Sequence, residues 1–199
     1  MTQADYPELR ARPITQQVAT RVPFRFIHIN KCAGSSIEIA LGLQKTHVTA
    51  ADVRNHVGAD AWDRMFTFSV VRHPIDRVVS IYHYRAAQDA LGADPPTLDA
   101  WIEAVFQRRD PAFLDETLMF APFEQWLCAD GAVLVDYVAR VEAMEEGWRH
   151  ICGTLSIDLP LGRFNANRYP DWRGQLGRSA LATLNDAFRD DFERYQYDT

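Results

Sequence analysis

Two short apolar runs in the first half of the chain have the pattern of buried strands. Residues 24–29 read Phe-Arg-Phe-Ile-His-Ile and residues 66–71 read Phe-Thr-Phe-Ser-Val-Val, both rich in aromatic and β-branched side chains. Each run is followed by a short break and then by apolar residues at helical spacing. The second of these helices is predicted to begin at Pro74, because proline is favoured at the first helical position. Its apolar stripe consists of Ile75, Val78, Val79 and Tyr82. The strand-loop-helix unit is therefore used twice.

The rest of the chain alternates helical and extended patterns. Thr49 and Asp52 have the spacing of a capping box, which predicts a helix from there to about Trp62. Further helices are expected over 35–43, 98–107, 116–127, 142–155 and 179–195, and a third strand over 133–141. This alternation predicts an α/β fold in three layers, with a central parallel sheet flanked by helices. In such a sheet, ligands bind beyond the carboxyl ends of the strands.

Length and composition fit one globular domain. The 199 residues are 47% apolar, which excludes a disordered or collagen-like chain, and we expect a single domain over 1–199 with a polar leader over 1–22. The 21 basic and 27 acidic residues give a net charge of −6, which argues against a dedicated nucleic-acid binder. No apolar run approaches the ~18 residues of a membrane span, and the N-terminus lacks the apolar block of a signal peptide. A cytoplasmic protein without a transmembrane segment is therefore expected.

The loop after the first strand has the composition of an anion site. It reads Asn30-Lys31-Cys32-Ala33-Gly34-Ser35-Ser36 and leads directly into a helix, whose first N–H groups and positive dipole end attract anions. An ordinary serine-rich helix start is the alternative interpretation. Lys31 precedes the loop, whereas the lysine of a Walker A sequence follows it, and the first Walker A glycine is missing. An ATPase or GTPase is therefore disfavoured.

The break after the second strand offers a second anion site at the same sheet edge. Arg72 supplies a planar guanidinium suited to phosphate oxygens, and Ser80 adds a hydroxyl donor on the following helix. The alternative for Arg72 is an ion pair with Asp76. Together the two breaks predict a ligand with two separated anionic groups.

The two segments together resemble the sulfotransferase family, in particular its carbohydrate sulfotransferase branch. The family signatures are H-I-P-K-T-x-G-T-S and R-[DN]-P-x-x-R-x-x-S-x-Y, and the chain has matching segments over 28–36 and 72–82. Asn30, Cys32 and His73 depart from the signatures. The resemblance implies a P-loop-like fold and the cofactor 3′-phosphoadenosine 5′-phosphosulfate (PAPS), with the desulfated nucleotide PAP as product. Its further landmarks are weaker and extend towards the C-terminus.

The resemblance also assigns roles to individual residues. The first loop would bind the 5′-phosphosulfate through Lys31, Cys32, Ala33, Gly34, Ser35 and Ser36. The second would bind the 3′-phosphate through Arg72 and Ser80, with Arg168 close to the same group. A surface loop rich in arginine is the alternative reading for the segment around Arg168. Lys31 would also be catalytic, because its charge can stabilise the leaving oxygen, and no metal is required.

Sulfuryl transfer to a hydroxyl also needs a base, and His47 is the preferred candidate. His47-Val48-Thr49 resembles the His-x-Ser/Thr of the uronosyl 2-O-sulfotransferases, in which that histidine is the general base. An imidazole that titrates near neutrality suits this role. Another histidine, Glu38, or no catalytic histidine at all are the alternatives.

The expected function is sulfuryl transfer from PAPS to a hydroxyl-bearing acceptor. A carbohydrate or glycolipid is the expected class of acceptor, and a bacterial-type enzyme is favoured. A P-loop kinase of a small molecule and a non-catalytic nucleotide-binding protein of the same fold are the rival interpretations.

Overall fold

The computed structural model describes residues 18–162 and 171–199, which form two compact units. Residues 18–71 and 126–162 form the first, here called the sheet unit. Residues 72–125 and 171–199 form the second, called the helical unit. The sheet unit contains the predicted parallel sheet, and the helical unit contains the chain that follows the second strand.

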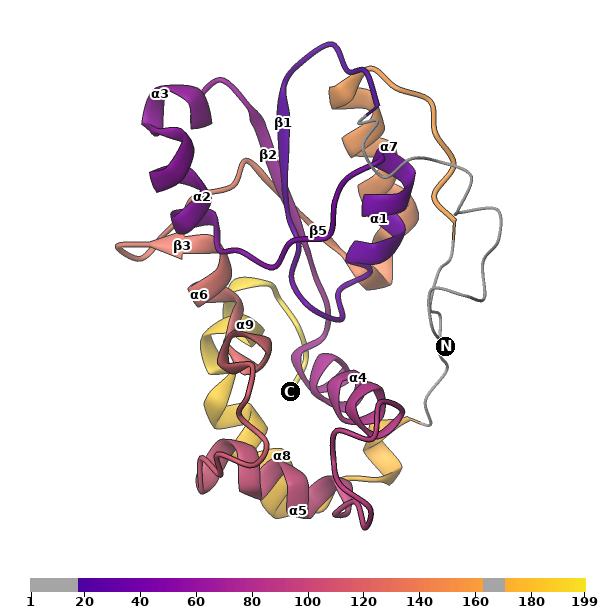
Figure 1. Ribbon diagram of the computed structural model, residues 1–199, viewed down its shortest axis with the longest axis vertical. Helices are drawn as coiled ribbons and strands as arrows, with labels where there is room; N and C mark the ends of the chain where they lie inside the picture. The colour runs from indigo at the N-terminus through magenta and orange to yellow at the C-terminus, as the bar shows by residue number, and fades with distance from the viewer. Residues whose placement is uncertain (1–17, 163–170) are drawn as a thin grey trace. The chain divides into compact units, whose positions relative to one another are not determined.

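The sheet unit is built on three parallel strands in the order β1-β2-β5 (Figure 1). The strands are β1 (Phe24–Ile27), β2 (Phe66–Val71) and β5 (Tyr137–Arg140). Phe26 pairs with Phe68, and Phe68 pairs with Tyr137, so aromatic side chains from all three strands share one face. The carboxyl ends of β1 and β2 consequently lie at one edge of the sheet, as the sequence predicts.

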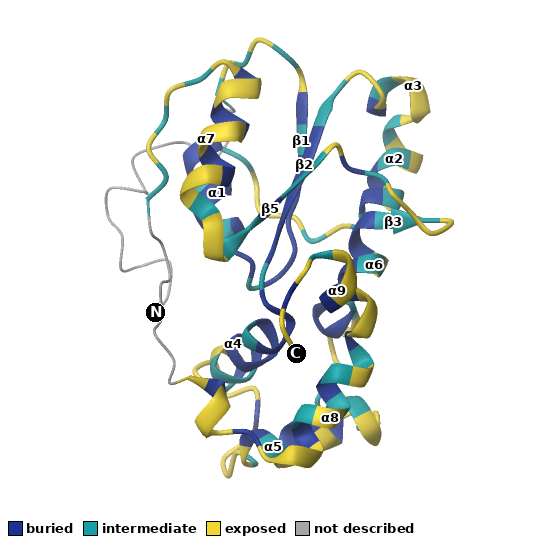
Figure 2. Ribbon diagram, turned by 180° about the vertical axis from the view of Figure 1, so that it is seen from behind, coloured by how far each residue is buried: buried dark blue, intermediate teal, exposed yellow. Residues whose placement is uncertain are grey.

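One face of the sheet carries the hydrophobic core. This face packs against α1 (Gly34–Leu41) and α7 (Met144–Leu155). The strands and the two helices together supply the core residues Phe24, Phe26, Ile37, Ala40, Leu41, Phe68, Val70, Ala139, Trp148, Ile151, Cys152 and Leu155. Helix α7 approaches β5 closely, because a Cβ atom added at Gly147 would lie 2.7 Å from Cβ of Ala139. Strands β1 and β2 are dark blue over most of their length in Figure 2, whereas the outer strand β5 is only partly buried.

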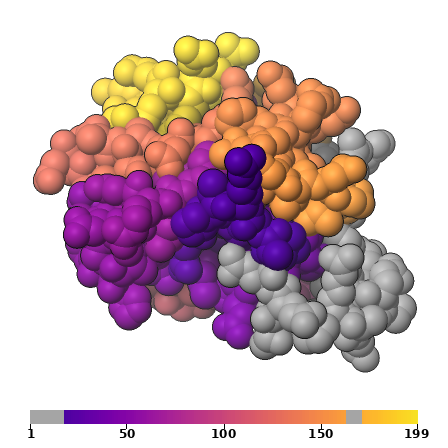
Figure 3. Space-filling view, turned by 90° about the horizontal axis from the view of Figure 1, so that it is seen from above, coloured from indigo at the N-terminus to yellow at the C-terminus, as the bar shows by residue number. Residues whose placement is uncertain are grey.

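Helices α2 (Ala50–Val57) and α3 (Ala59–Trp62) lie on the other side of the sheet (Figures 1 and 3). The three-layer arrangement is therefore present in the sheet unit. Thr49 caps α2 as predicted, since its Oγ1 atom accepts a hydrogen bond from the Asp52 amide at 3.1 Å. The expected single helix up to Trp62 is wrong, because Gly58 adopts a φ of 86° and separates the two helices.

The third strand is shorter than expected. Val133 belongs instead to a small antiparallel hairpin formed by β3 (Cys128–Ala129) and β4 (Ala132–Val133) around the Asp130-Gly131 turn. Asp136 then accepts hydrogen bonds from both the amide and the hydroxyl of Thr67, at 2.7 and 2.8 Å. These bonds fix the entry to β5, which begins at Tyr137, and a 3₁₀ turn over Val141–Ala143 leads into α7.

The helical unit begins with α4 (Pro74–Ala86), whose first residue is the predicted proline. The predicted helix over 98–107 is α5 (Leu98–Ile102) continued by a π-helical turn over Glu103–Gln107. The helix expected over 116–127 is a 3₁₀ turn (Thr117–Phe120) followed by α6 (Phe123–Leu127). A 3₁₀ turn (Trp172–Gly174) precedes α8 (Arg178–Ala187) and α9 (Arg189–Arg194), which replace the continuous C-terminal helix.

Buried charges organise the helical unit. Arg77 is 1% exposed and donates to the carbonyl oxygens of Ala121 and Met119 at 2.7 and 2.8 Å. Asp191, also 1% exposed, accepts from the Phe123 amide at 2.9 Å. Pro122 separates the 3₁₀ turn from α6, so the backbone groups on either side of it lack the partners of a regular helix. The Arg77 and Asp191 side chains supply hydrogen-bond partners for these groups. Across the described ranges, the helices are all too short or too polar to cross a bilayer.

Candidate active site

The 30–36 loop leaves the sheet in a strained conformation. Strand β1 ends at Ile27, two residues earlier than expected, and the chain turns through Lys31 and Ala33, which have φ angles of 65° and 58°. Non-glycine residues adopt this left-handed region at a cost, and such residues cluster at functional sites. Helix α1 follows at Gly34 with no acidic residue in its first turn, so no carboxylate there neutralises the positive end of its dipole.

Burial alternates along this loop. Lys31, Ala33 and Ser35 are partly exposed, whereas Cys32 is 1% and Ser36 is 5% exposed. Cys32 is therefore a buried residue. It stands where the family signature has a threonine, so the inner side of the loop lacks that hydroxyl group. Lys31, Ala33 and Ser35 are therefore the residues of this loop that present surface to solvent.

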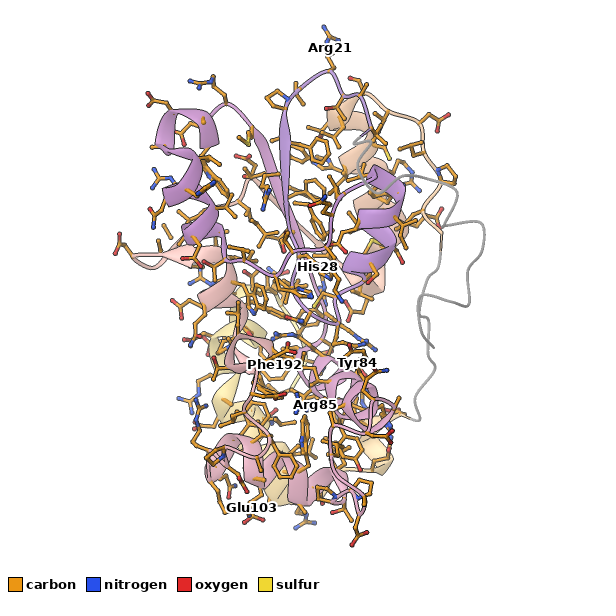
Figure 4. The ribbon with its side chains drawn as sticks, in the orientation of Figure 1. Arg21, His28, Tyr84, Arg85, Glu103 and Phe192 are labelled. Carbon is orange, nitrogen blue, oxygen red and sulfur yellow. The ribbon has the colours of Figure 1, made fainter. Side chains whose placement is uncertain are left out.

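Gly34 is required by a close contact with His28. A Cβ atom added at Gly34 would lie 1.9 Å from Cδ2 and 2.0 Å from Nε2 of the His28 ring, so any larger residue would displace the imidazole. His28 is 4% exposed and lies just beyond the carboxyl end of β1 (Figure 4). The glycine of the signature therefore allows the loop to pack directly on this histidine.

His28 in turn pairs with a buried carboxylate. Its Nδ1 atom donates to Oε1 of Glu38 at 2.7 Å, and Glu38 is 5% exposed. Glu38 therefore does not have the accessibility expected of a general base. This pair is not predicted by the sequence motifs, although an acidic residue between apolar neighbours in Ser-Ile-Glu-Ile-Ala is a signal of a buried, partnered carboxylate.

The structure brings His47 next to this loop. The two histidine rings have centroids 4.4 Å apart, and Nδ1 of His47 donates to the His28 carbonyl oxygen at 3.1 Å. A carbonyl oxygen can only accept, so Nδ1 carries the proton, and in the neutral ring Nε2 carries the lone pair. Burial lowers the pKa of His47, and the charges of His28 and Lys45 lower it further, while the hydrogen bond and Glu38 act in the opposite direction. The neutral, proton-accepting form is thus favoured at pH 7.

Arg72 and Ser80 lie in the helical unit, at the beginning of the chain that follows β2. Arg72 is half-buried, and Ser80 is 4% exposed on α4. The two described residues Arg72 and Asp76 do not form the ion pair that was the alternative for Arg72. The second arginine of the signature, Arg77, has the structural role given above.

His73, which departs from the signature, has a structural role. It is buried, and its Nε2 atom donates to the Asp198 carbonyl oxygen at 2.9 Å. Its ring lies 5.4–5.6 Å from three aromatic rings, those of Trp172, Phe192 and Tyr197. His73 therefore links the start of α4 to the C-terminal part of the helical unit. Arg168 lies outside the described residues.

Comparison with known proteins shows which family the chain belongs to. The model of the Sulfotransferase family matches residues 18–198, a range that includes both signature segments. The chain belongs to the sulfotransferase family. No curated protein and no solved structure matches it. The resemblance inferred from the two segments is confirmed at the level of the family, and membership supports sulfuryl transfer as the reaction class.

Proposed function

We propose that this sulfotransferase moves the sulfuryl group of PAPS to a hydroxyl of a carbohydrate or glycolipid and releases PAP. The single observation that carries the proposal is the placement of His47, with Nδ1 bonded to a carbonyl oxygen, against the histidine on which the 30–36 loop packs. A P-loop-like fold for the sheet unit agrees with family membership and with the loop between β1 and α1.

In the proposed reaction, the 30–36 loop binds the 5′-phosphosulfate. The backbone N–H groups of residues 33–35 and the ammonium of Lys31 face the anion, with Cys32 and Ser36 on the inner side, where the Ser36 amide donates to the Ala33 carbonyl oxygen at 3.0 Å. As the bond between sulfur and the bridging oxygen breaks, its electron pair stays on the phosphate oxygen. Lys31 stabilises this developing charge, which is the largest electrostatic demand of the step.

His47 supplies the base. Its Nε2 lone pair accepts the proton of the acceptor hydroxyl while that oxygen forms the new bond to sulfur. The lowered pKa keeps the ring neutral at pH 7, so the base is ready without prior loss of a proton.

Arg72, Ser80 and Arg168 complete the proposed cofactor set at the 3′-phosphate. The guanidinium of Arg72 offers two parallel N–H donors to phosphate oxygens, a geometry that lysine cannot reproduce. Recognition of this second phosphate would distinguish PAPS from the more abundant adenosine nucleotides, which lack it.

The test is transfer of labelled sulfate from PAPS to a panel of hydroxyl acceptors. We expect Lys31→Ala to reduce transfer at least 10²–10³-fold, as removal of a group that stabilises transition-state charge does. The chain offers a matched control, since Lys45 is exposed and is the other lysine of the sequence. Because the charge of Lys45 lowers the pKa of His47, the comparison is made above that pKa, where Lys45→Ala should keep near-normal activity. His47→Ala should cut turnover and leave PAP binding intact.

PAP binding without transfer to any acceptor in the panel would contradict the assignment as an enzyme and favour a nucleotide-binding protein. Equal loss of activity in the two lysine variants would remove the specific role of Lys31. Normal turnover in His47→Ala would show that the base lies elsewhere.

A further inference from the structure

Three side chains of the sheet unit form a continuous series from a helix to the proposed base. Glu38 comes from α1, His28 from the residues just after β1, and His47 from the segment that joins α1 to α2. His28 touches both of the others, through a hydrogen bond to Glu38 and through its carbonyl oxygen and ring to His47. The series is therefore built from elements that are separate in sequence.

Glu38 holds two of these elements with one oxygen atom. Its Oε1 atom accepts from Nδ1 of His28 at 2.7 Å and from the amide of Thr46 at 3.3 Å. Thr46 is the residue immediately before His47, so the carboxylate restrains the backbone that carries the base. A carboxylate 5% exposed is costly to bury unless it is hydrogen-bonded, and both bonds serve that need.

His28 is itself held from several sides. Glu38 fixes its Nδ1 atom, Gly34 packs against its Cδ2–Nε2 edge, and Phe26 stacks on it with centroids 5.7 Å apart. Its carbonyl oxygen is therefore a fixed acceptor for Nδ1 of His47. A base that must accept a proton at one nitrogen benefits from such a fixed partner at the other, because a neutral imidazole otherwise exchanges between two tautomers.

Two other side chains act on the His47 ring. Lys45 acts on it through its positive charge, and Trp126 meets its ring edge-on with centroids 6.4 Å apart. Neither is hydrogen-bonded to the imidazole among the interactions of the described residues. The restraint on the tautomer therefore comes from His28 and, through it and Thr46, from Glu38.

We propose that Glu38 and His28 are positioning residues that hold His47 in the tautomer with a protonated Nδ1 and an unprotonated Nε2. This inference rests on the proposed function of His47 as the base. Glu38 does not contact the reacting atoms in this scheme. Its effect on the rate is transmitted through His28 and the Thr46 amide.

The direct test is the ¹⁵N NMR spectrum of His47 in the full-length protein, assigned by comparison with His47→Ala. In the wild type we expect the chemical shifts of an Nδ1–H, Nε2-unprotonated ring above the pKa. Glu38→Gln keeps an acceptor oxygen and should keep this tautomer. Glu38→Leu removes both hydrogen bonds and should give shifts averaged between the two tautomers.

Kinetics provide the second readout. In Glu38→Leu, kcat should fall roughly 10–100-fold, the range that loss of an outer partner of a functional histidine typically causes, while the Kd for PAP stays within about twofold. Glu38→Gln should restore most of the turnover. Glu145 is an exposed glutamate of α7, so Glu145→Leu is the matched control and should behave as the wild type.

The positioning proposal and the proposed function are contradicted by different results. An Nε2-protonated His47 in the wild type would overturn the positioning proposal, whether or not Glu38→Leu folds. An unchanged tautomer and turnover in folded Glu38→Leu would overturn it as well. If the wild type transfers no sulfate but shows the expected tautomer response, the positioning stands and the proposed function is what fails.

Discussion

At the scale of single residues, the structure separates positions that look equivalent in the sequence. Arg72 and Arg77 belong to the same signature, yet Arg77 is 1% exposed and serves two carbonyl oxygens, whereas Arg72 is half-buried. The sequence cannot distinguish them, because the partners of Arg77 lie more than forty residues away. Composition and spacing singled out the 30–36 loop, and the family resemblance singled out His47, whereas the bond between His28 and Glu38 required the fold.

Arg72→Ala should specifically remove recognition of the 3′-phosphate. A hydrogen-bonded charge pair is worth about 1.5–3 kcal/mol, so PAP should bind roughly 10–100-fold more weakly. The affinity for 5′-AMP, which lacks this phosphate, should change less than about twofold. Isothermal titration of both nucleotides measures the two effects.

Arg149→Ala is the control for Arg72→Ala, because the Arg149 side chain is 70% exposed on α7. It should leave both affinities unchanged. A parallel loss of PAP and 5′-AMP binding in Arg72→Ala would instead indicate a general electrostatic or structural role.

At the scale of elements, the local sequence pattern predicts which helices and strands exist better than it predicts their lengths. Strand β2 has the predicted bounds, since all of Phe66–Val71 is apolar or pairs within the sheet. Strand β1 ends early because the His28 carbonyl oxygen accepts from the His47 ring and Ile29 accepts from Cys32 in a turn. The helix break at Gly58 follows from the positive φ of that glycine, which helical periodicity does not encode. The 3₁₀ turn before Pro122 depends on the tertiary hydrogen bonds that Arg77 donates to its carbonyl oxygens.

Two glycines of α7 should respond in opposite ways to alanine. A Cβ at Gly147 would lie 2.7 Å from that of Ala139 on β5, so Gly147→Ala should lower the free energy of unfolding by about 1–3 kcal/mol. Gly153, in the same helix, has nothing within 4 Å of such an atom. Gly153→Ala should raise the free energy of unfolding by about 0.5–1 kcal/mol, through helix propensity alone.

Urea denaturation of the two variants and the wild type measures this difference. Destabilisation by both substitutions would mean that α7 tolerates no added methyl group on either face. Stabilisation by both would show that α7 and β5 are not packed as closely as the structure indicates.

At the scale of the whole molecule, family membership extends over both compact units. The matched range, 18–198, contains the sheet unit with its loop and the helical unit with Arg72 and Ser80. The stability of the helical unit depends on the carboxylate of Asp191, which matches one of the weaker family landmarks but whose burial the sequence did not predict. Burial raises the pKa of Asp191 to about 6, against the opposing effects of the Phe123 amide and the Arg77 charge.

This carboxylate predicts an unusual pH dependence of stability. Between pH 3.8 and about 6, the folded protein holds the Asp191 proton more tightly than the unfolded chain does, so the free energy of unfolding falls as the pH rises through this window. The raised pKa corresponds to roughly 3 kcal/mol. Asp191→Asn removes this contribution, so its stability relative to the wild type should increase from pH 4 to pH 7.

Denaturation at pH 4, 5.5 and 7 tests this dependence. Glu193→Gln, at an exposed position of the same helix α9, is the control and should run parallel to the wild type. A constant difference between Asp191→Asn and the wild type across the three pH values would contradict a raised pKa at Asp191.

Calorimetric titration with PAP is the decisive measurement for a PAPS-dependent enzyme, because it requires neither a known acceptor nor turnover. We expect saturable binding of PAP, weaker binding of ATP and of 5′-AMP, and loss of PAP binding in Lys31→Ala but not in Lys45→Ala. Binding of ATP more tightly than PAP, or no saturation by PAP at millimolar concentration, would contradict this assignment.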